Sequence, residues 1–386
     1  MEVIMKTRPL NIAVSGLNAT DNPGPGVPVI RSIRESGQFS GTITGLSYDP
    51  MDPGIYMDGT CEDVYLMAYP SQGAGRLLER IREINEKKAI DVIIPTLDAE
   101  LSAYLKIRGE LEAMGIHTFL PDAAALGMTS KANLAKLSGM GIDVPGGKEL
   151  YDPGALWQAG ETFRFPLVVK GRFYEAHVAY SAAEAEFYFH KISARWGLPV
   201  IVQEFVRGEE YDTVALGDGE GGLIGAVPMK KMQLTDKGKA WGGITIEDTR
   251  MNRFVRDVIW KLKWRGPCEL EMIKEKKTGR FYMIELNPRF PAWCYLSVGA
   301  GQNLPWATVK LALSVPVKPF DAYSVGTMFL RNSVDHIYPL PDCREVHQLK
   351  VHKDFAVRFD GNTYTAPLWN IGKKLTLKSD AHSLTL

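Results

Sequence analysis

Two acidic segments form a predicted β-hairpin, and this hairpin constrains the fold more than any other part of the chain. The first strand covers residues 269–273 (ELEMI), and the second covers residues 281–287 (FYMIELN) and ends at Pro288. The charged loop between them carries a glycine near its end, as hairpin loops do. Because side chains alternate across a strand, we expect Glu269 and Glu271 to share one face of the hairpin.

The same alternation in the second strand places Glu285 and Asn287 on one face, together with Phe281 and Met283. The hairpin can then bring Glu271, Glu285 and Asn287 together as three oxygen ligands, which suit Mg²⁺ beside a polyphosphate. The alternative is a solvated sheet face with exposed carboxylates. Glu and Asn are poor strand formers inside an apolar strand, so a compensating role such as metal binding is favoured.

Composition narrows the class of protein. The 386 residues suffice for two or three domains, and 45 Lys plus Arg balance 45 Asp plus Glu. The zero net charge gives no reason to expect a nucleic acid partner, and no apolar run is long enough to span a bilayer. Without a signal peptide we expect a cytoplasmic location. The four cysteines have no CxxC or CxxH spacing, so we expect free thiols and neither a zinc site nor a catalytic cysteine.

The first third of the chain alternates strands and helices. Such alternation favours a parallel sheet with helices on both faces, the Rossmann-like form of an α/β domain. The predicted strands are 10–15, 41–46 and 90–95, and the predicted helices are 27–35, 77–87 and 101–114.

After Pro121 the pattern changes to α+β. A helix is predicted at 130–140, with Ser130 as its N-cap and Gly141 as its stop. A loop rich in glycine and lysine is expected at 235–243. Further strands are predicted at 167–170, 176–180, 200–206, 211–216 and 223–233, further helices at 182–196, 250–264 and 304–314, and short strands of a β-rich tail at 327–330, 355–359 and 375–377.

The segment 284–289 (IELNPR) resembles the metal-binding strand of the ATP-grasp superfamily, and Glu271 stands where that superfamily has its other metal carboxylate. The resemblance covers about residues 10 to 315. It implies that Glu271, Glu285 and Asn287 hold Mg²⁺, with Mn²⁺ as an alternative ion, and that Arg289 contacts the γ-phosphate of ATP or an acyl-phosphate.

The resemblance also implies a domain organisation. Residues 1–125 would form a Rossmann-like pre-ATP-grasp domain, and residues 126–198 and 199–315 the small (lid) and large subdomains of an ATP-grasp fold. Residues 316–386 would form a small β-rich extension, which could cap an acceptor pocket or mediate a homodimer.

Three lysines are candidates for phosphate contacts. Lys170 closes the buried strand at 167–170, and the resemblance implies that it reaches the α- and β-phosphates, although such a lysine often only extends to solvent. Lys131 matches a second phosphate-reaching lysine. Lys230 is preferred over Lys231 as a catalytic cation because Lys230 shares a strand face with Pro228; a solvated basic edge is the alternative.

The segment 203–211 (QEFVRGEEY) resembles the hinge that binds the nucleotide between the two subdomains. The resemblance implies backbone contacts to adenine, a side-chain acceptor for its exocyclic amine, and carboxylates for the ribose or in support of the metal. A strand that ends in an acidic turn is the alternative reading. The backbone contacts to adenine would come from Phe205 and Val206, and the acceptor for the exocyclic amine would be Glu204. The carboxylate for the ribose or the metal would be Glu209 or Glu210.

The segment after Lys170 departs from the superfamily pattern. Residues 171–177 (GRFYEAH) stand where a glycine-rich flap usually covers the phosphates with backbone amides, yet they hold one glycine. Arg172 could replace amide donors, or the flap could be short. His177 is interpreted as a structural residue rather than a base.

Substrate contacts are the least constrained part of the prediction. Asp98 and Glu100 follow a parallel strand at the sheet edge where ligands gather, although helix capping by Asp98 explains the same pattern. Trp293 could line an acceptor pocket or pack in the core. The resemblance implies a carboxylate–amine ligase that uses ATP and acts on a small-molecule or peptide carboxylate and an amine. A bicarbonate-activating enzyme of the carboxylase or carbamoyl-phosphate type and a non-catalytic ATP-binding module are the alternatives.

Overall fold

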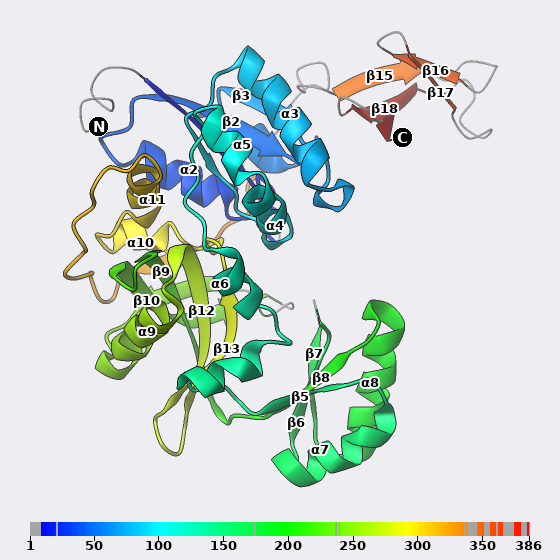
Figure 1. Ribbon diagram of the computed structural model, residues 1–386, viewed down its shortest axis with the longest axis vertical. Coiled ribbons are helices and arrows are strands. Elements are labelled where there is room, and N and C mark those ends of the chain that lie inside the picture. Colours follow the sequence, from blue (N-terminus) through cyan, green and yellow to red (C-terminus); the bar gives the residue numbers. More distant parts are fainter. Residues whose placement is uncertain are drawn as a thin grey trace.

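The computed structural model describes residues 9–20, 22–172, 175–235, 238, 240–335 and 337, and the backbone of five short strands between residues 346 and 385. Figure 1 shows an N-terminal domain in blue and cyan, a large sheet with its helices in green and yellow, and a smaller lid reached through two crossing segments. This mixture of an α/β domain and α+β units agrees with the predicted fold class.

The N-terminal domain is a parallel four-stranded sheet in the order β3-β2-β1-β4. Its central strand LNIAVS is buried along its whole length, as a parallel strand covered on both faces must be. The strands are β1 (Leu10–Ser15), β2 (Gly41–Ser47), β3 (Asp63–Leu66) and β4 (Val92–Ile94), and the helices are α2 (Gly26–Arg34), α3 (Ala74–Lys87), α4 (Asp98–Lys106) and α5 (Arg108–Ala113). The sequence did not predict β3, and the helix predicted at 101–114 is divided between α4 and α5.

The lid is an antiparallel sheet with helices on one face. Strands β5 (Gly147–Leu150), β6 (Leu167–Lys170), β7 (Ala176–Ala179) and β8 (Val200–Glu204) have the order β5-β8-β6-β7. Leu167 and Val169 pack in one core with helices α7 (Leu156–Phe163) and α8 (Ala182–Trp196). Alternation therefore turns Lys170 to the opposite face of the sheet.

The helix predicted at 130–140 is wrong in type and start. Helix α6 (Ala123–Met128) comes first, capped by the Asp122 carboxylate, and is followed by turns and a 3₁₀ segment (Leu134–Met140). The side chains of Thr129 and Asn133 bond to backbone carbonyls of the preceding turn, which competes with helix propagation. Gly141 ends the segment in the left-handed conformation, as predicted.

The large subdomain is built on a six-stranded antiparallel sheet in the order β13-β12-β9-β10-β11-β14. Helix α9 packs on one face, whereas α11 contacts β9 and β12 and also α2 of the N-terminal domain. The strands are β9 (Gly208–Asp218), β10 (Leu223–Leu234), β11 (Ala240–Thr245), β12 (Arg265–Glu275), β13 (Phe281–Asn287) and β14 (Met328–Leu330), and the helices are α9 (Thr249–Leu262), α10 (Leu296–Gly299) and α11 (Leu304–Ala312).

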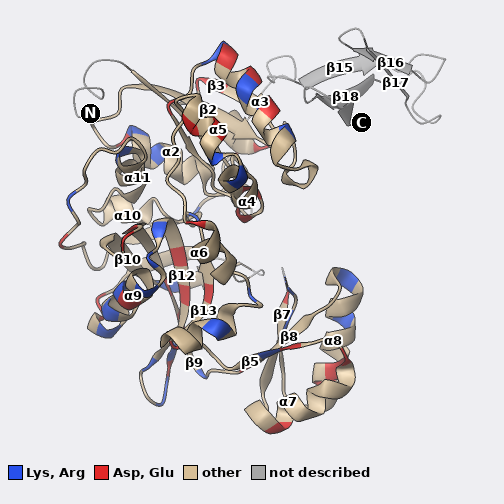
Figure 2. Ribbon diagram, viewed as in Figure 1, with Lys and Arg blue, Asp and Glu red and all other residues tan. Residues whose placement is uncertain are grey.

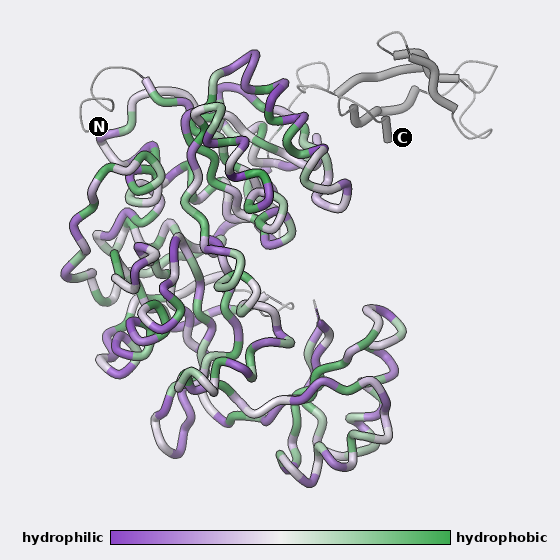
Figure 3. The backbone as a smooth tube through the Cα atoms, in the orientation of Figure 1, coloured by the Kyte–Doolittle hydropathy of each residue, from purple (hydrophilic) through white to green (hydrophobic). Residues whose placement is uncertain are grey.

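Strands β11 and β14 extend the large sheet beyond what the sequence predicted. Strand β11 occupies the end of the segment predicted as a loop. Gly243 allows this strand to lie close to Met229, because a Cβ at Gly243 would come within 2.2 Å of the Met229 sulfur. Strand β14 pairs with β11, so the sheet of the large subdomain extends beyond the predicted limit at residue 315. Figure 3 shows hydrophobic positions along the sheets and hydrophilic ones on the outer helices.

The remaining features of the fold are the buried cysteines, the character of the helices and a few short elements. Cys268 and Cys294 are buried free thiols, as predicted, and burial raises the pKa of both. In the part of the chain that the structure describes, no helix combines the length and the apolar character needed to cross a membrane. The short elements are 3₁₀ turns at Pro53–Ile55, Pro70–Gln72 and Pro153–Ala155, and strands β15 (Val346–Lys350), β16 (Ala356–Phe359), β17 (Asn362–Thr365), β18 (Lys374–Ser379) and β19 (Leu384–Thr385).

Candidate active site

The acidic hairpin predicted from the sequence is formed by β12 and β13, and its carboxylates share one face. Glu271 lies opposite Glu285, and Glu269 lies opposite Asn287. On the other side of β12, Glu271 lies opposite Asp212 of β9. Figure 2 shows these acidic positions in red along neighbouring strands. Cross-strand pairing therefore concentrates negative charge on the sheet face opposite α9.

A β-bulge corrects the predicted alternation in the second strand. The register shifts between Glu271 and Met272, and Ile284 has no partner on β12. The extra residue turns Met283 and Phe281 into the core beneath α9, whereas the sequence placed them beside Glu285. The bulge allows apolar packing and an acidic face to coexist on one short strand.

The donor set fits a hard divalent cation. Asn287 Nδ2 donates to Glu271 Oε1 at 3.0 Å and to Glu269 Oε2 at 3.1 Å, which leaves the amide oxygen of Asn287 as a further acceptor. The described residues contain no group of three or more His, Cys, Asp or Glu arranged to hold a metal. Carboxylate and amide oxygens are the ligands that Mg²⁺ accepts.

The charge balance points the same way. The carboxylates at the site outnumber the lysines and Arg289, and burial raises the pKa of Asp212, Glu269 and Glu285, so a divalent ion on this face would stabilise their ionised forms. The carboxylates are Asp98, Glu210, Asp212, Glu269, Glu271 and Glu285, and the cations are Lys131, Lys170, Lys231 and Arg289.

Lys231, and not Lys230, reaches the acidic face. Its ammonium lies 3.2 Å from Asp212 Oδ1 and 3.5 Å from Glu271 Oε2. Lys230 shares a face with Pro228, as the sequence predicted, but on that face it pairs with Glu209 at 3.0 Å and lies near the ring of Tyr211. Strand alternation separates the two lysines.

Asp212 is a site residue that the sequence analysis missed. Its side chain is buried, and burial together with the charge of Glu271 raises its pKa, against the opposing effect of Lys231. The sequence predicted a strand at 211–216 that includes Asp212, but not which strand it pairs with. Only the pairing of β9 with β12 reveals it.

Arg289 joins the hairpin to the N-terminal domain. Its guanidinium lies 3.1 Å from Asp98 Oδ2 and 3.2 Å from Glu269 Oε2. Burial lowers the pKa of Arg289, but Asp98 and Glu269 outweigh it and the net shift is upward. Trp293 donates its indole N–H to Glu269 Oε1 at 2.7 Å and is itself buried in the core. The tryptophan thus fixes Glu269, which in turn orients Arg289.

Two lysines face the hairpin from outside the large sheet. Lys131 lies 3.6 Å from Glu285 Oε1. Lys170 comes from β6 of the lid, and burial lowers its pKa to about 8, with a further lowering by Lys131 and opposing contributions from Glu285, Glu271 and Glu210. Burial of Lys170 outweighs the nearby carboxylates, so phosphate oxygens would be favourable neighbours of its ammonium form.

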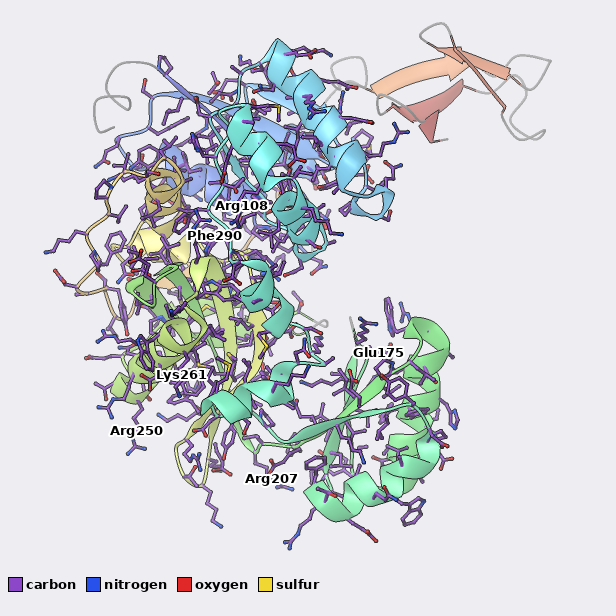
Figure 4. All side chains as sticks on the ribbon, in the orientation of Figure 1. Arg108, Glu175, Arg207, Arg250, Lys261 and Phe290 are labelled. Carbon is purple, nitrogen blue, oxygen red and sulfur yellow. The ribbon has the colours of Figure 1, made fainter. Side chains whose placement is uncertain are left out.

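The predicted hinge runs between the lid and the large sheet. Glu204 is exposed at the end of β8, where its carboxylate accepts from the Gly146 amide at 3.4 Å; Val206 is buried. Glu210 lies 3.4 Å from Lys231 and so belongs to the site, whereas Glu209 is turned toward Lys230. Figure 4 shows Arg207, next to Val206, at this junction.

Glu100 is enclosed and Asp98 is open. The carboxylate of Glu100 is fully buried and accepts from the hydroxyls of Ser15 and Tyr48 and from the amides of Thr96 and Leu97. Burial raises the pKa of Glu100 despite these donors. Four donors make it part of the turn that starts α4. Asp98 keeps half of its side chain exposed beside Arg289.

The described residues on either side of positions 173 and 174 are hydrogen-bonded to each other and to the lid. The Gly171 amide donates to the Glu175 carbonyl at 2.9 Å. The Glu175 carboxylate lies 2.7 Å from His177 and accepts from the Trp196 indole at 3.1 Å, and the His177 ring stacks on Tyr188. Figure 4 shows Glu175 beside β7 and α8. These contacts agree with a structural His177. The predicted flap residues 173 and 174 lie outside the described residues.

Arg331 is a second site residue that the sequence analysis missed. It follows β14, is half-buried, and donates to the Ala292 carbonyl at 2.5 Å. Burial lowers its pKa, and Cys294 and Glu269 raise it by less. No ion pair involves Arg331 within the described ranges. A half-buried cation without an ion pair among the described residues is suited to an anionic ligand.

Comparison with solved structures identifies the fold. Biotin carboxylase from Campylobacter jejuni has a TM-score of 0.65, with 14% identity over 84% of this chain and 75% of its own. An L-amino acid ligase from Bacillus licheniformis has a TM-score of 0.60, with 16% identity over 81% of this chain and 76% of its own. N5-carboxyaminoimidazole synthetase from Staphylococcus aureus has a TM-score of 0.62, with 13% identity over 82% and 80%.

This chain has the ATP-grasp fold. The resemblance seen in the sequence is thereby confirmed for the fold and its two-subdomain architecture. No curated protein matches the chain in sequence. A family model described as the Mu transposase C-terminal domain matches residues 338–386, which lie within the predicted extension.

Proposed function

We propose that the chain is an ATP-dependent ligase that phosphorylates a substrate carboxylate to an acyl-phosphate and joins it to an amine, with release of ADP and phosphate. The observation that carries this proposal is the convergence of Glu271, Glu285 and Asn287 on one sheet face, with Lys170 opposite and Arg289 at the end of the strand. The ATP-grasp fold places such a face between two subdomains and supports the proposal at the level of the fold.

Each cation would have a separate task. Lys170 and Lys131 approach Glu285 from outside the large sheet and would hold the phosphates of ATP from that side. Arg289, fixed by Asp98 and Glu269, would contact the γ-phosphoryl group as it passes from ATP to the substrate carboxylate. Lys231, which lies beside Glu271, would take the catalytic role predicted for Lys230. A metal ion on Glu271, Glu285 and Asn287 would neutralise phosphate charge.

The reaction demands little covalent chemistry from the protein. A carboxylate and a triphosphate repel each other, so catalysis requires that both anions be held close in a cationic environment. Arg331 would bind the substrate carboxylate, because it is a half-buried cation with no ion pair in the described part of the chain. Asp98, exposed beside Arg289, would accept a hydrogen bond from an incoming amine.

Bicarbonate is the second candidate substrate. Solved structures with this fold include one biotin carboxylase domain with MgADP and bicarbonate, at 14% identity to this chain and a TM-score of 0.63. The guanidinium groups of Arg289 and Arg331 would suit bicarbonate as well as an organic carboxylate, and the two substrates differ in a direct assay. Phosphate release that depends on bicarbonate and not on amino acids would favour this candidate.

The proposal is tested with a screen for phosphate release. Purified full-length protein is incubated with ATP and Mg²⁺ and with panels of amino acids, peptides and bicarbonate. The Glu285→Gln variant should lose at least about a hundredfold in turnover because an amide cannot replace a charged ligand, while its thermal melting stays near that of the wild type. Wild-type turnover in Glu285→Gln would refute the assignment of the metal ligands. ATP binding without phosphate release under any condition would favour a non-catalytic module.

A further inference from the structure

Lys231 occupies an unusual position for a phosphate-binding lysine. Its side chain is 7% exposed, and its ammonium lies within 3.5 Å of three carboxylates. The three oxygens are Asp212 Oδ1 at 3.2 Å, Glu210 Oε2 at 3.4 Å and Glu271 Oε2 at 3.5 Å. The lysine therefore stands where it neutralises part of the charge that a divalent cation would neutralise.

Both oxygens of Glu271 are engaged in this arrangement. Lys231 is next to Oε2, and the Asn287 amide nitrogen donates to Oε1 at 3.0 Å. For Glu271 to ligate a metal, Lys231 must withdraw from Oε2, or the ion must bind against its positive charge. Either course costs free energy as long as nothing else attracts the lysine.

We propose that Lys231 couples metal binding to nucleotide binding: it holds Glu271 in the nucleotide-free protein and moves to the phosphates when the nucleotide arrives, which frees Glu271 for the metal. This inference rests on the proposed function, since it assumes a nucleotide in the same site. The lysine stem has four rotatable bonds and can change partners without movement of the strand.

Asp212 provides the fixed point for this movement. It is 2% exposed and belongs to the central strand β9, so its carboxylate cannot follow the lysine or leave the sheet. Its Oδ1 has the shortest of the three contacts with Lys231. Asp212 thus keeps the ammonium close to the site in both positions and is a positioning residue.

The adjacent lysine offers a matched control. Lys230 is adjacent in the chain and has the same charge, but it points to the other side of the strand and pairs with Glu209. A change at Lys230 alters net charge by the same amount as a change at Lys231. Only the change at Lys231 frees an oxygen of Glu271.

The test measures metal binding without turnover. Isothermal titration calorimetry gives the affinity of the full chain for Mn²⁺, first alone and then with saturating β,γ-methylene ATP. In the wild type, Mn²⁺ should bind weakly alone and much more tightly with the analogue. Lys231→Met should bind Mn²⁺ alone at least about tenfold more tightly, because one nearby positive charge is removed, and its affinity should change less when the analogue is added. Lys230→Met should match the wild type, and Lys231→Arg should restore much of the difference.

The outcomes separate this coupling from the proposed function. The coupling is overturned if Lys231→Met binds Mn²⁺ no more tightly than Lys230→Met does. It is also overturned if the analogue raises the Mn²⁺ affinity of Lys231→Met as much as that of the wild type. If Lys231→Met does not fold, Lys231→Gln keeps a polar tip and undergoes the same titrations. A wild type that shows the coupling but releases no phosphate with any carboxylate overturns the ligase and leaves the coupling intact.

Discussion

The lowered pKa of Lys170 leads to a prediction about nucleotide affinity. Burial between the lid and the hairpin holds this pKa at about 8, against 10.5 for an ordinary lysine. Phosphate oxygens favour the ammonium form, so the affinity for the nucleotide should be lost as the pH rises through about 8. An ordinary lysine would stay charged over the same range.

The magnitude follows from the titration of one group. At pH 7 about nine-tenths of Lys170 is protonated, and at pH 9 about one-tenth is. If only the protonated form binds phosphate, the dissociation constant of an ATP analogue should rise about tenfold between these two pH values. Residual binding by the neutral form would make the rise smaller.

Calorimetric titration with β,γ-methylene ATP at fixed Mg²⁺ measures this rise. Lys170→Arg supplies the control, since a guanidinium remains charged throughout, and its affinity should change much less with pH. Lys170→Met should bind weakly at both pH values. If the affinity of the wild type is as insensitive to pH as that of Lys170→Arg, then Lys170 is not the phosphate contact, or its pKa is not lowered.

Two further predictions concern single side chains. Arg331→Met should raise the KM for the carboxylate substrate at least about tenfold, because a charge-assisted contact is lost, while the affinity for the ATP analogue stays unchanged. Steady-state kinetics measures the KM and calorimetry measures the nucleotide affinity. A parallel loss of nucleotide affinity would contradict the assignment. Asp122→Ala should lower the free energy of unfolding by about 1 kcal/mol in urea denaturation, because the Asp122 carboxylate caps α6 at the Ala125 amide. The control Glu112→Ala, at an exposed position, should change the free energy of unfolding by less than about 0.5 kcal/mol.

The arginine that ends the hairpin links the two parts of the chain. Arg289 bonds to Asp98 at the start of α4 and to Glu269 within β12. The N-terminal domain thus reaches the site through one carboxylate at the edge of its parallel sheet, where ligands of such sheets gather. A substrate that binds Asp98 would directly affect the arginine assigned to the phosphoryl group.

Local patterns determined the elements that the sequence predicted well. The parallel strands of the N-terminal domain are short apolar runs, and α8 runs between its Ser181 cap and Gly197. The pairing of Glu271 with Glu285 follows from a hairpin with a short charged loop. In each case the information lies within a few residues along the chain, because periodicity, caps and turns are local properties.

Tertiary structure decided which charges meet. The bulge at Ile284 turned Met283 into the core, and strand pairing brought Asp212 and Lys231 to Glu271. Arg331 approaches the site only because β14 joins the edge of the large sheet. The sequence by itself determined that an acidic hairpin exists. The register between distant strands determined which cations face it, because Coulomb interactions depend on distances in space that no local pattern encodes.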